Sequence, residues 1–354
     1  MPCDARCALA VLDTKADATM MPLNAPRQIP AALAAPANRM RQAWCLVLAC
    51  LLAMTGAQAS EGPPMVAIQV APNSYYVQGL AAMGSPKNQN FISNAGFVVA
   101  EEGVIIIDAL GSPALAERLV AVIAGITPKP ITHVLVTHYH ADHIYGLQTF
   151  KALGAKIIAQ KGAKEYIHSE TARLRLQASR TDLAPWVDEQ TQIVQPDQWV
   201  DGGEDMTLSG TRFHLALVGP SHTPEDLAIW VPSERALFSG DLIFNGRLPF
   251  VGKANSSHWI KALDQMTDFD AVAVVPGHGR WSDNPKQDIA LMRDYLGYLR
   301  ETMGAAVDDL LPFDAAYAEA DWSRFEAVPM FRFANRMNAY NTYLLMEAEG
   351  LRAK

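Results

Sequence analysis

Residues 131–143 read ITHVLVTHYHADH and place a strongly apolar run directly before a dense group of polar side chains. The run from Ile131 to Val136 is rich in β-branched and aliphatic residues, which predicts a strand buried on both faces. The six positions after Thr137 hold three histidines and an aspartate. Imidazole and carboxylate groups are metal ligands, and a fold does not need four of them on one loop for stability. The stretch therefore predicts a metal site at the end of a buried strand.

Three segments further along the chain each follow an apolar run with another ligand-type side chain. They are Ser-His-Thr-Pro at His222, Ser-Gly-Asp-Leu at Asp241 and Pro-Gly-His-Gly at His278. With the first cluster they give seven candidate metal ligands, enough for two metal ions: His138, His140, Asp142, His143, His222, Asp241 and His278.

The spacing within the first cluster favours two neighbouring metal positions. In an extended strand end, side chains two residues apart point the same way, so His138 and His140 can converge on one metal. The chain then turns, so that Asp142 and His143 face an adjacent position and can bind a second ion. The sequence thus predicts a binuclear centre.

The rest of the chain alternates apolar runs with amphipathic helical patterns, and its second half repeats the plan of the first. Strands are expected at 75–77, 96–99, 104–107, 131–136, 157–158, 206–209, 212–218, 227–232, 235–239 and 271–275. Helices are expected at 113–124, 144–153, 162–177, 257–267 and 286–303. Because these strands are almost continuously apolar, both of their faces must be covered. We therefore expect an α/β fold with two mixed β-sheets stacked face to face and helices outside.

The ends of the chain differ in composition from this central part. Residues 1–39 are rich in Ala and Pro and show no period, so we expect a disordered extension or a mis-assigned start. Residues 40–59 combine a positive flank, a short apolar stretch and small residues at a cleavage site, which predicts a secretory signal peptide and a periplasmic or secreted product. We expect the metal-binding domain over 60–303. Residues 304–354 should form a helical extension packed on that domain or on a second subunit.

Cysteine and charge usage restrict the classes of partner. All four cysteines, the last of them Cys50, precede the predicted cleavage site, so the exported chain would have neither disulfides nor thiolate ligands. Cys50 leaves a lipoprotein signal as an alternative.

The net charge of the chain is negative, because it carries 29 basic and 37 acidic residues. Without residues 1–59, which hold five basic and three acidic residues, the net charge moves from −8 to −10. We therefore expect a small-molecule substrate, and neither nucleic acid nor, after signal removal, a membrane as partner.

Taken in order, these motifs resemble the metallo-β-lactamase superfamily over residues 70–280. The resemblance rests on the HxHxDH loop, the three later segments, and Asp108, which closes Val-Ile-Ile-Ile-Asp. It implies an αββα sandwich, and it implies that Asp108 stands behind the ligands and steadies their loop. It also implies the ligand sets: His138, His140 and His222 for the first metal, Asp142, His143 and His278 for the second, and Asp241 as the bridge.

Within the superfamily, residues 240–252 and the following Trp259 look most like exported hydrolases associated with pyrroloquinoline-quinone dehydrogenases, the quinoprotein relay system zinc metallohydrolases. That likeness makes a periplasmic dehydrogenase system a candidate partner. Arg247 and Lys253 are expected to clamp a substrate carboxylate, and His258 to contact substrate beside them. Common zinc β-lactamases have Cys where Asp241 stands, which puts lactam hydrolysis in doubt.

The resemblance implies two Zn²⁺ ions, with Fe or Mn as alternatives. Two cations about 3.5–4 Å apart would lower the pKa of a shared water and hold it as hydroxide for attack on an acyl carbon. Asp142 or Asp241 would relay the proton. The expected reaction is hydrolysis of an ester, thioester, lactone or amide. Three alternatives stay open: a β-lactamase, an iron-dependent sulfur oxygenase, and a non-catalytic component of a dehydrogenase system.

Overall fold

The computed structural model describes residues 62–352 of the 354-residue chain. The predicted extension 1–39 and signal peptide 40–59 lie outside the described residues, so both stay predictions. Within 62–352, no helix combines the length and apolarity needed to cross a bilayer.

Two β-sheets form the centre of the fold. The first contains seven strands in chain order: β1 (Ala67–Ala71), β2 (Ser74–Val77), β3 (Ala95–Val99), β4 (Val104–Ile107), β5 (Ile131–Leu135), β6 (Lys156–Gln160) and β7 (Gln198–Val200). Strands β1 to β4 pair antiparallel, and β4 to β7 pair parallel. The second sheet has the order β12-β11-β10-β9-β8: β12 (Ala273–Gly279), β11 (Ala236–Asn245), β10 (Leu227–Val231), β9 (Thr211–Leu217) and β8 (Glu204–Leu208). Only its β11–β12 pair is parallel, so both sheets are mixed.

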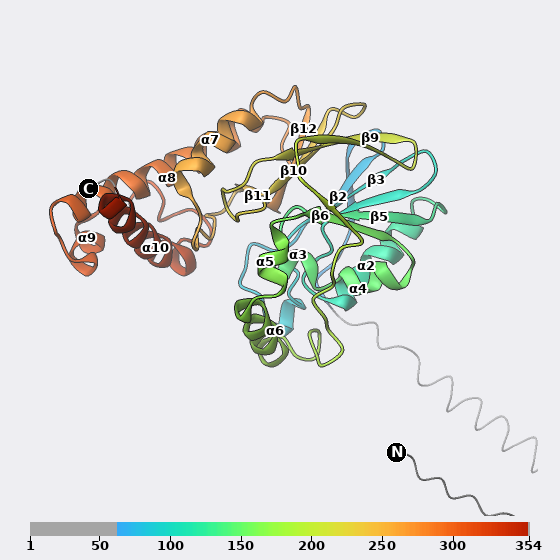
Figure 1. Ribbon diagram of the computed structural model, residues 1–354, viewed down its shortest axis with the longest axis horizontal. Coiled ribbons are helices and arrows are strands. Elements are labelled where there is room, and N and C mark those ends of the chain that lie inside the picture. The colour runs from blue at the N-terminus through green and yellow to red at the C-terminus, as the bar shows by residue number, and fades with distance from the viewer. Residues whose placement is uncertain (1–61, 353–354) are drawn as a thin grey trace, which may run out of the picture. The chain divides into compact units, whose positions relative to one another are not determined.

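Apolar side chains fill three layers around these sheets. The middle layer lies between the sheets, where Ile105 and Leu135 of the first meet Ile229 and Phe238 of the second. Helices α2 (Pro113–Ala124) and α4 (Leu147–Ala152) cover the outer face of the first sheet. Helices α7 (Ser256–Met266) and α8 (Pro285–Asp308) cover the outer face of the second (Figure 1). The predicted αββα sandwich is confirmed.

The structure also departs from the predicted elements. Strands β1 and β7 were not predicted, because they lie at the two edges of the sheet and lack a long apolar run. The expected strands 235–239 and 271–275 end too early, because Asp241 and His278 lie within β11 and β12. Strand β11 passes a bulge at Gly240 and goes on pairing with β12, so that Phe244 lies opposite His278.

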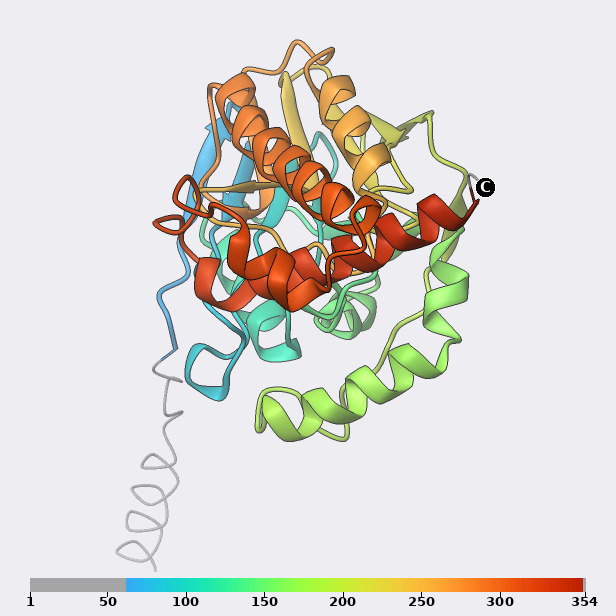
Figure 2. The ribbon, with the colours of Figure 1, turned by 90° about the vertical axis from the view of Figure 1, so that its left-hand side faces the viewer.

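The C-terminal part consists of helices that pack on the second sheet's side of the molecule. Helix α8 runs through the predicted boundary at 303, and α9 (Phe313–Glu319) and α10 (Phe331–Arg352) follow it. Figure 2 shows α10 crossing α8. The crossing side of α10 carries Ala334, Ala339 and Thr342, all buried, and such small side chains let two helices approach closely. The division into a domain and an extension stays a prediction.

Candidate metal centre

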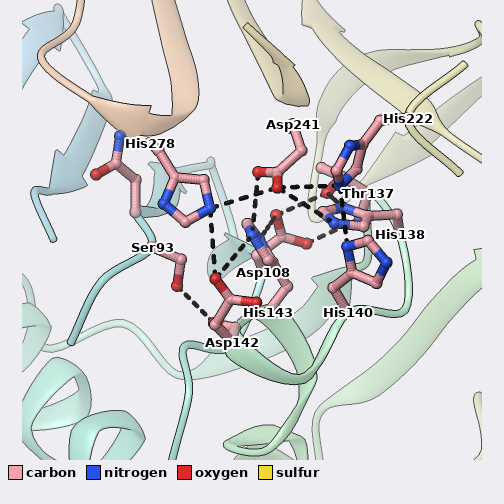
Figure 3. Close-up of polar contacts among 12 residues, drawn as sticks. Ser93, Asp108, Thr137, His138, His140, Asp142, His143, His222, Asp241 and His278 are labelled. Carbon is pink, nitrogen blue, oxygen red and sulfur yellow. Dashed lines mark hydrogen bonds and ion pairs between the residues drawn. The ribbon is translucent and has the colours of Figure 1, made fainter. Parts of the chain in front are cut away.

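The seven candidate ligands come from four segments of the chain and meet at one edge of the sandwich. Strand β5 ends at Leu135, and the chain passes His138 and His140 before it turns into the short helix α3 (Ala141–Ile144). Asp142 and His143 lie in α3, and His222 lies in the loop between β9 and β10. Asp241 lies in β11 and His278 in β12. Figure 3 shows all seven side chains pointing into the same space.

The ligand atoms form two adjacent groups. One contains His138, His140, His222 and Asp241, and the other contains Asp142, His143 and His278; within each group the atoms lie within 4.8 Å of one another. In the first group, Nδ1 of His140 lies 2.9 Å from Nε2 of His222. In the second, Nε2 of His278 lies 3.3 Å from Oδ2 of Asp142. The histidines fall into the groups that the family resemblance implies.

The carboxylate of Asp241 lies between the two groups (Figure 3). Its Oδ2 is 3.3 Å from Nε2 of His222 in the first group and 3.3 Å from Nε2 of His278 in the second. Its Oδ1 is 3.1 Å from Nε2 of His143, also in the second. One side chain thus faces both candidate metal positions, which is the placement that a bridging ligand requires.

Unsatisfied polar atoms test whether these residues suit metal ions. Nε2 of His138, Nε2 of His143 and Oδ1 of Asp241 are buried and make no hydrogen bond of good geometry among the described residues, although the last two lie 3.1 Å apart as an ion pair. Buried polar atoms normally have one, because an unsatisfied group loses its solvation without compensation. Three unsatisfied atoms of ligand type, directed into one space, fit bound cations that would supply the missing interactions.

The electrostatics of the first group fit metal binding as well. Burial lowers the pKa of His222 to about 3 and holds the pKa of His138 well below its usual value. Both imidazoles are therefore neutral at physiological pH and keep the lone pair that a metal needs. Burial alone would raise the pKa of Asp241, but the neighbouring histidines, His278 and His143 first, hold it well below the ordinary value. This carboxylate is therefore ionised.

In the second group the carboxylates dominate. Burial would lower the pKa of His143, yet Asp241, Asp108 and Asp142 together raise it well above the ordinary value. The pKa of His278 is raised by Asp241 and Asp142 against the same opposing effect of burial. Cations entering this group must therefore displace protons from both rings, so metal binding there is coupled to pH.

Asp108 occupies the position behind the ligands that the resemblance implies. It follows β4 with a φ of 62°, a left-handed conformation that is uncommon for non-glycine residues but that aspartate adopts more readily than most. Its carboxylate accepts hydrogen bonds of 2.8 Å from the backbone N–H and from the hydroxyl of Thr137. Its Oδ2 also lies 2.9 Å from Nδ1 of His143. The side chain thus fixes the start of the ligand loop and the orientation of one ring.

Thr137 and Asn94 support the site, although we did not assign them a role from sequence. The Thr137 hydroxyl lies 3.0 Å from Nδ1 of His138, so it holds a second ring. Asn94 donates hydrogen bonds of 2.8 Å to the carbonyls of Pro276 and Gly279, on either side of His278. Thr137 directly precedes the histidine motif, and this position could have indicated its role. Asn94 lies far from every ligand in sequence, and nothing near it indicated a role.

Gly240 lets β11 pass close to the ligand loop. Its φ is 53°, and a Cβ atom there would lie 2.7 Å from the Thr137 hydroxyl oxygen. A larger residue would therefore push Thr137 away from Asp108 and His138. The glycine of the Ser-Gly-Asp segment is explained by this contact.

The three residues predicted to contact substrate lie in different environments. Arg247 is 1% exposed, its guanidinium lies over the rings of Phe244 and Phe250, and its Nη1 is 3.5 Å from Nδ1 of His278. Lys253 is exposed. His258 is partly exposed and lies 3.3 Å from Ser221, the residue before His222. Of the three, Arg247 alone contacts a candidate ligand directly.

Residues 246–254, here called the Arg247 loop, are held by the C-terminal helices. The buried side chain of Asn338 on α10 accepts a 2.8 Å hydrogen bond from the Val251 N–H and donates one of 2.7 Å to the Pro249 carbonyl. The Leu248 N–H donates a 2.9 Å bond to the Pro329 carbonyl, just before α10. The helical extension therefore shapes the side of the site next to His278. The sequence of 304–354 gave no indication of this contact.

Comparison with known proteins agrees with the geometry. Residues 89–278 match the sequence model of the metallo-β-lactamase superfamily, and this range spans more than half of the chain. The chain belongs to the metallo-β-lactamase superfamily. The prediction of an enzyme, a hydrolase of this superfamily, is confirmed at that level.

Two relatives with different activities are similar to this chain in sequence. A type 2 metallo-β-lactamase from Elizabethkingia meningoseptica is 26% identical over 246 residues, covering 68% of this chain and 89% of that protein. A linear primary-alkylsulfatase from Pseudomonas sp. (strain ATCC 19151) is 24% identical over 239 residues, covering 58% of this chain and 45% of that one.

Solved structures show the same fold at low identity. A metallo-β-lactamase from Pontibacter korlensis superposes with a TM-score of 0.51 at 18% identity, over 66% of this chain and 99% of that one. The stereoselective inverting sec-alkylsulfatase Pisa1 from Pseudomonas sp. gives a TM-score of 0.61 at 20% identity, over 79% of this chain and 50% of that one. The chain thus spans about half the length of the alkylsulfatases that it resembles.

Proposed function

We propose that this superfamily hydrolase uses two adjacent zinc ions to cleave an ester, thioester, lactone or amide bond of a small substrate. The observation that carries the proposal is the carboxylate of Asp241, which lies within 3.1–3.3 Å of imidazole nitrogens in both ligand groups. A fold needs no such carboxylate between two sets of buried imidazoles, whereas a binuclear centre does.

Each of the candidate ligands would have a distinct role in metal binding or proton transfer. His138, His140 and His222 would hold one ion, and Asp142, His143 and His278 the other. When bound, the ions would supply Lewis acidity that activates water and polarises the scissile group. Asp142 is the better placed of the two candidate proton acceptors, because its side chain is 18% exposed and that of Asp241 only 4%. Asp142 can thus pass a proton towards solvent.

The environment of Arg247 supports the proposal that the substrate carries an anionic group. Its Nη2 is buried and has no hydrogen-bond partner among the described residues, and its Nη1 lies beside His278. Burial lowers the pKa of the guanidinium, with Asp241 and Asp142 acting against that shift. An arginine remains charged even so, and its planar N–H groups suit carboxylate or sulfate oxygens.

Hydrolysis of a sulfate ester is the second candidate. The alkylsulfatase superposition covers 79% of this chain, compared with 66% for the lactamase. The C-terminal helices hold the Arg247 loop, and a buried arginine next to the metal pocket suits a sulfate group.

Export, subgroup and partner are part of the proposal. The sequence of residues 40–59 supports a periplasmic or secreted enzyme, with the mature chain beginning at Ser60. The stretch 240–252 supports membership of the quinoprotein relay subgroup, and with it a periplasmic dehydrogenase system as partner. Sequencing the N-terminus of the protein from a periplasmic extract would test the export proposal directly.

The function is tested by metal analysis combined with a substrate panel. Protein from its own host is assayed for bound metals, and then with a lactam, a lactone, a thioester, an aryl ester and an alkyl sulfate. We expect two zinc ions per chain and acyl hydrolysis that is lost on chelation and in His140→Ala. Turnover of the sulfate ester alone would favour the second candidate. One iron per chain with oxygen consumption would favour an oxygenase, and a zinc-loaded protein inert to the whole panel would contradict a catalytic role.

A further inference from the structure

Two adjacent acidic residues, Glu225 and Asp226, are buried in the short segment between His222 and strand β10. They are 5% and 3% exposed. The ion pairs found within residues 62–352 include neither of them. Burying a carboxylate costs free energy unless it accepts hydrogen bonds. The bonds that these two side chains accept should therefore explain why the fold keeps them there.

Asp226 shapes the turn that directly follows His222. Its carboxylate accepts hydrogen bonds of 2.8 Å from the backbone N–H of Thr223 and of 2.6 Å from the Thr223 hydroxyl. Bonds from an aspartate to nearby backbone take the place of regular secondary structure and fix the path of a loop. The turn therefore holds the backbone next to His222, and the Glu225 side chain bonds to a different segment.

Glu225 bonds to the loop that carries the first two candidate ligands. Its Oε1 accepts a hydrogen bond of 3.2 Å from the backbone N–H of Tyr139, the residue between His138 and His140. The Tyr139 side chain is 1% exposed, and its hydroxyl donates a 3.1 Å bond to the Val194 carbonyl. The residue between the two histidines is thus held at its backbone and at its side chain.

The candidate histidine ligands differ in how their rings are held. Three of the five have a supporting protein group within 3.0 Å of Nδ1: His138, His143 and His278. Nδ1 of His222 is buried and has no hydrogen-bond partner among the described residues. Nδ1 of His140 lies 2.9 Å from Nε2 of His222, so these two rings contact each other. The positions of His140 and His222 must therefore come from the backbone segments that carry them.

We propose that Glu225 is a positioning residue of the metal centre, which holds the backbone between His138 and His140 in register with His222. The inference rests on the proposed binuclear metal centre. In extended backbone, the side chains on either side of a residue point the same way. The direction of the Tyr139 peptide therefore sets the direction of both flanking rings, and Glu225 fixes that peptide from the segment that carries the third histidine of the first ligand group.

Glu225 and Asp108 hold the ligand loop at two points. Asp108 bonds to it at Thr137, and Glu225 bonds two residues further on, at Tyr139. The Leu227 N–H adds a bond of 2.9 Å to the Thr137 carbonyl, again from the segment after His222. Groups that fix the orientation of metal ligands contribute to metal affinity. Loss of the Glu225 carboxylate should therefore weaken metal binding at the first ligand group.

Metal competition on the full chain tests the proposal. The zinc content of each protein is counted, and zinc is then titrated away with a chromophoric chelator. We expect Glu225→Ala to bind one of its two zinc ions about 10- to 100-fold more weakly, and the other with nearly the wild-type affinity. Glu225→Gln keeps an oxygen that can accept the Tyr139 N–H, so it should recover most of the affinity.

Two further variants separate the lost bond from a general loss of packing. Glu225→Leu fills the same space without an acceptor, so it should weaken zinc binding as Glu225→Ala does, and it replaces that variant if the alanine protein does not fold. The matched control is Glu234→Ala. Glu234 also accepts a backbone N–H across the fold, 2.7 Å from that of Asn73, but at the opposite end of β10. Its loss should lower the melting temperature and leave both zinc affinities unchanged.

Substitution of Co²⁺ for zinc gives a second readout that does not depend on activity. The visible absorption of Co²⁺ reports the arrangement of its ligands. We expect the spectrum of Glu225→Ala to differ from that of the wild type, and the spectra of Glu225→Gln and Glu234→Ala to match it. A general loss of stability would not by itself change the spectrum of the folded protein.

The outcomes distinguish this inference from the proposed function. Unchanged zinc affinity and cobalt spectrum in Glu225→Ala and Glu225→Leu would overturn the inference and leave the function standing. Equal losses in Glu225→Ala and Glu225→Gln would also overturn it, because the charge and not the hydrogen bond would then be responsible. A wild-type protein that binds two zinc ions but hydrolyses nothing would contradict the function alone. A wild-type protein that binds no metal would contradict both.

Discussion

The metal pocket and the Arg247 loop adjoin each other at His278, but they are built in opposite ways. In the pocket, each candidate ligand lies within a strand or a few residues from the end of one, and short-range motifs place it. Asp108 and Thr137 add hydrogen bonds from the neighbouring strand ends. In the loop, Arg247 keeps its position because Asn338, from a helix 87 residues beyond Val251, holds the backbone. The comparison separates a part of the site that its local sequence determines from a part that depends on tertiary contacts.

Removing the bridging carboxylate should have the largest effect. We expect Asp241→Ala to lower kcat/KM by about a thousandfold or more, because one side chain serves both ligand groups. Steady-state assays together with metal counting would measure the loss. Asp205→Ala, which removes an exposed carboxylate paired with Arg212, is the control and should leave both values unchanged. Full metal loading and activity in Asp241→Ala would show that the ligand groups do not depend on this residue.

A substitution of Asp108 tests how strongly the side chains at the strand ends determine the metal affinity of the pocket. Asp108→Ala leaves Thr137 and His143 without a shared acceptor, so we expect metal affinity to fall by about 10- to 100-fold. Competition with a chromophoric chelator would report the change. An unchanged affinity would mean that the ligand loop holds its shape without this carboxylate.

These contrasts explain how much the sequence could predict. The strands with long apolar runs were predictable, and so was the clustering of the seven candidate ligands, because each of these residues lies within a few residues of the run that positions it. The edge strands β1 and β7 were not, because exposed edges carry no apolar signal. Strand β11 was cut short at Gly240, because a glycine usually interrupts a strand, and here it permits a close approach to Thr137 instead.

Arg247 and Asn338 mark the limit of sequence reasoning at this site. A loop arginine is usually solvated, and only the packing of Phe244, Phe250 and α10 shows that this one is buried. An asparagine inside a helix gives no sign of which loop its amide will meet. Contacts between segments so far apart depend on the assembled core, which local periodicity does not describe.

Asn338 offers the sharpest test of the difference between the two regions. Asn338→Leu removes both bonds to the Arg247 loop, so we expect KM for an anionic substrate to rise by about tenfold with two metal ions still bound. A neutral analogue should show little change in KM, because Arg247 would not contact it. Asn335→Leu removes a buried amide of the same helix whose side-chain hydrogen bonds within residues 62–352 go to Tyr295 and Tyr317, and it should lower thermal stability without the change in KM.

If both asparagine variants raise KM equally for both substrates, the loop is merely part of the general packing of the helices. If Asn338→Leu loses metal ions, the loop and the pocket are a single unit, and the contrast drawn above would not hold.

Competition between protons and zinc for the rings of His143 and His278 should have the smallest effect, and it concerns the metal pocket alone. The raised pKa values of His143 and His278 mean that the metal-free folded protein binds more protons than the unfolded chain. Their contribution to the stability of the metal-free protein is therefore complete below about pH 6.5, the ordinary histidine pKa, and is lost as the pH rises through the raised values. Zinc must displace these same protons, so its affinity changes in the opposite direction and grows with pH.

Added zinc should consequently raise the melting temperature by more at pH 8.5 than at pH 6, by a few degrees, in scanning fluorimetry with and without the metal. Neutral His138 and His222, whose pKa values lie below this window, should contribute nothing to the difference. Chelator-treated protein is the reference at each pH. An equal zinc shift at both pH values would mean that the second ligand group carries no protons for the metal to displace. The first group alone would then account for zinc binding.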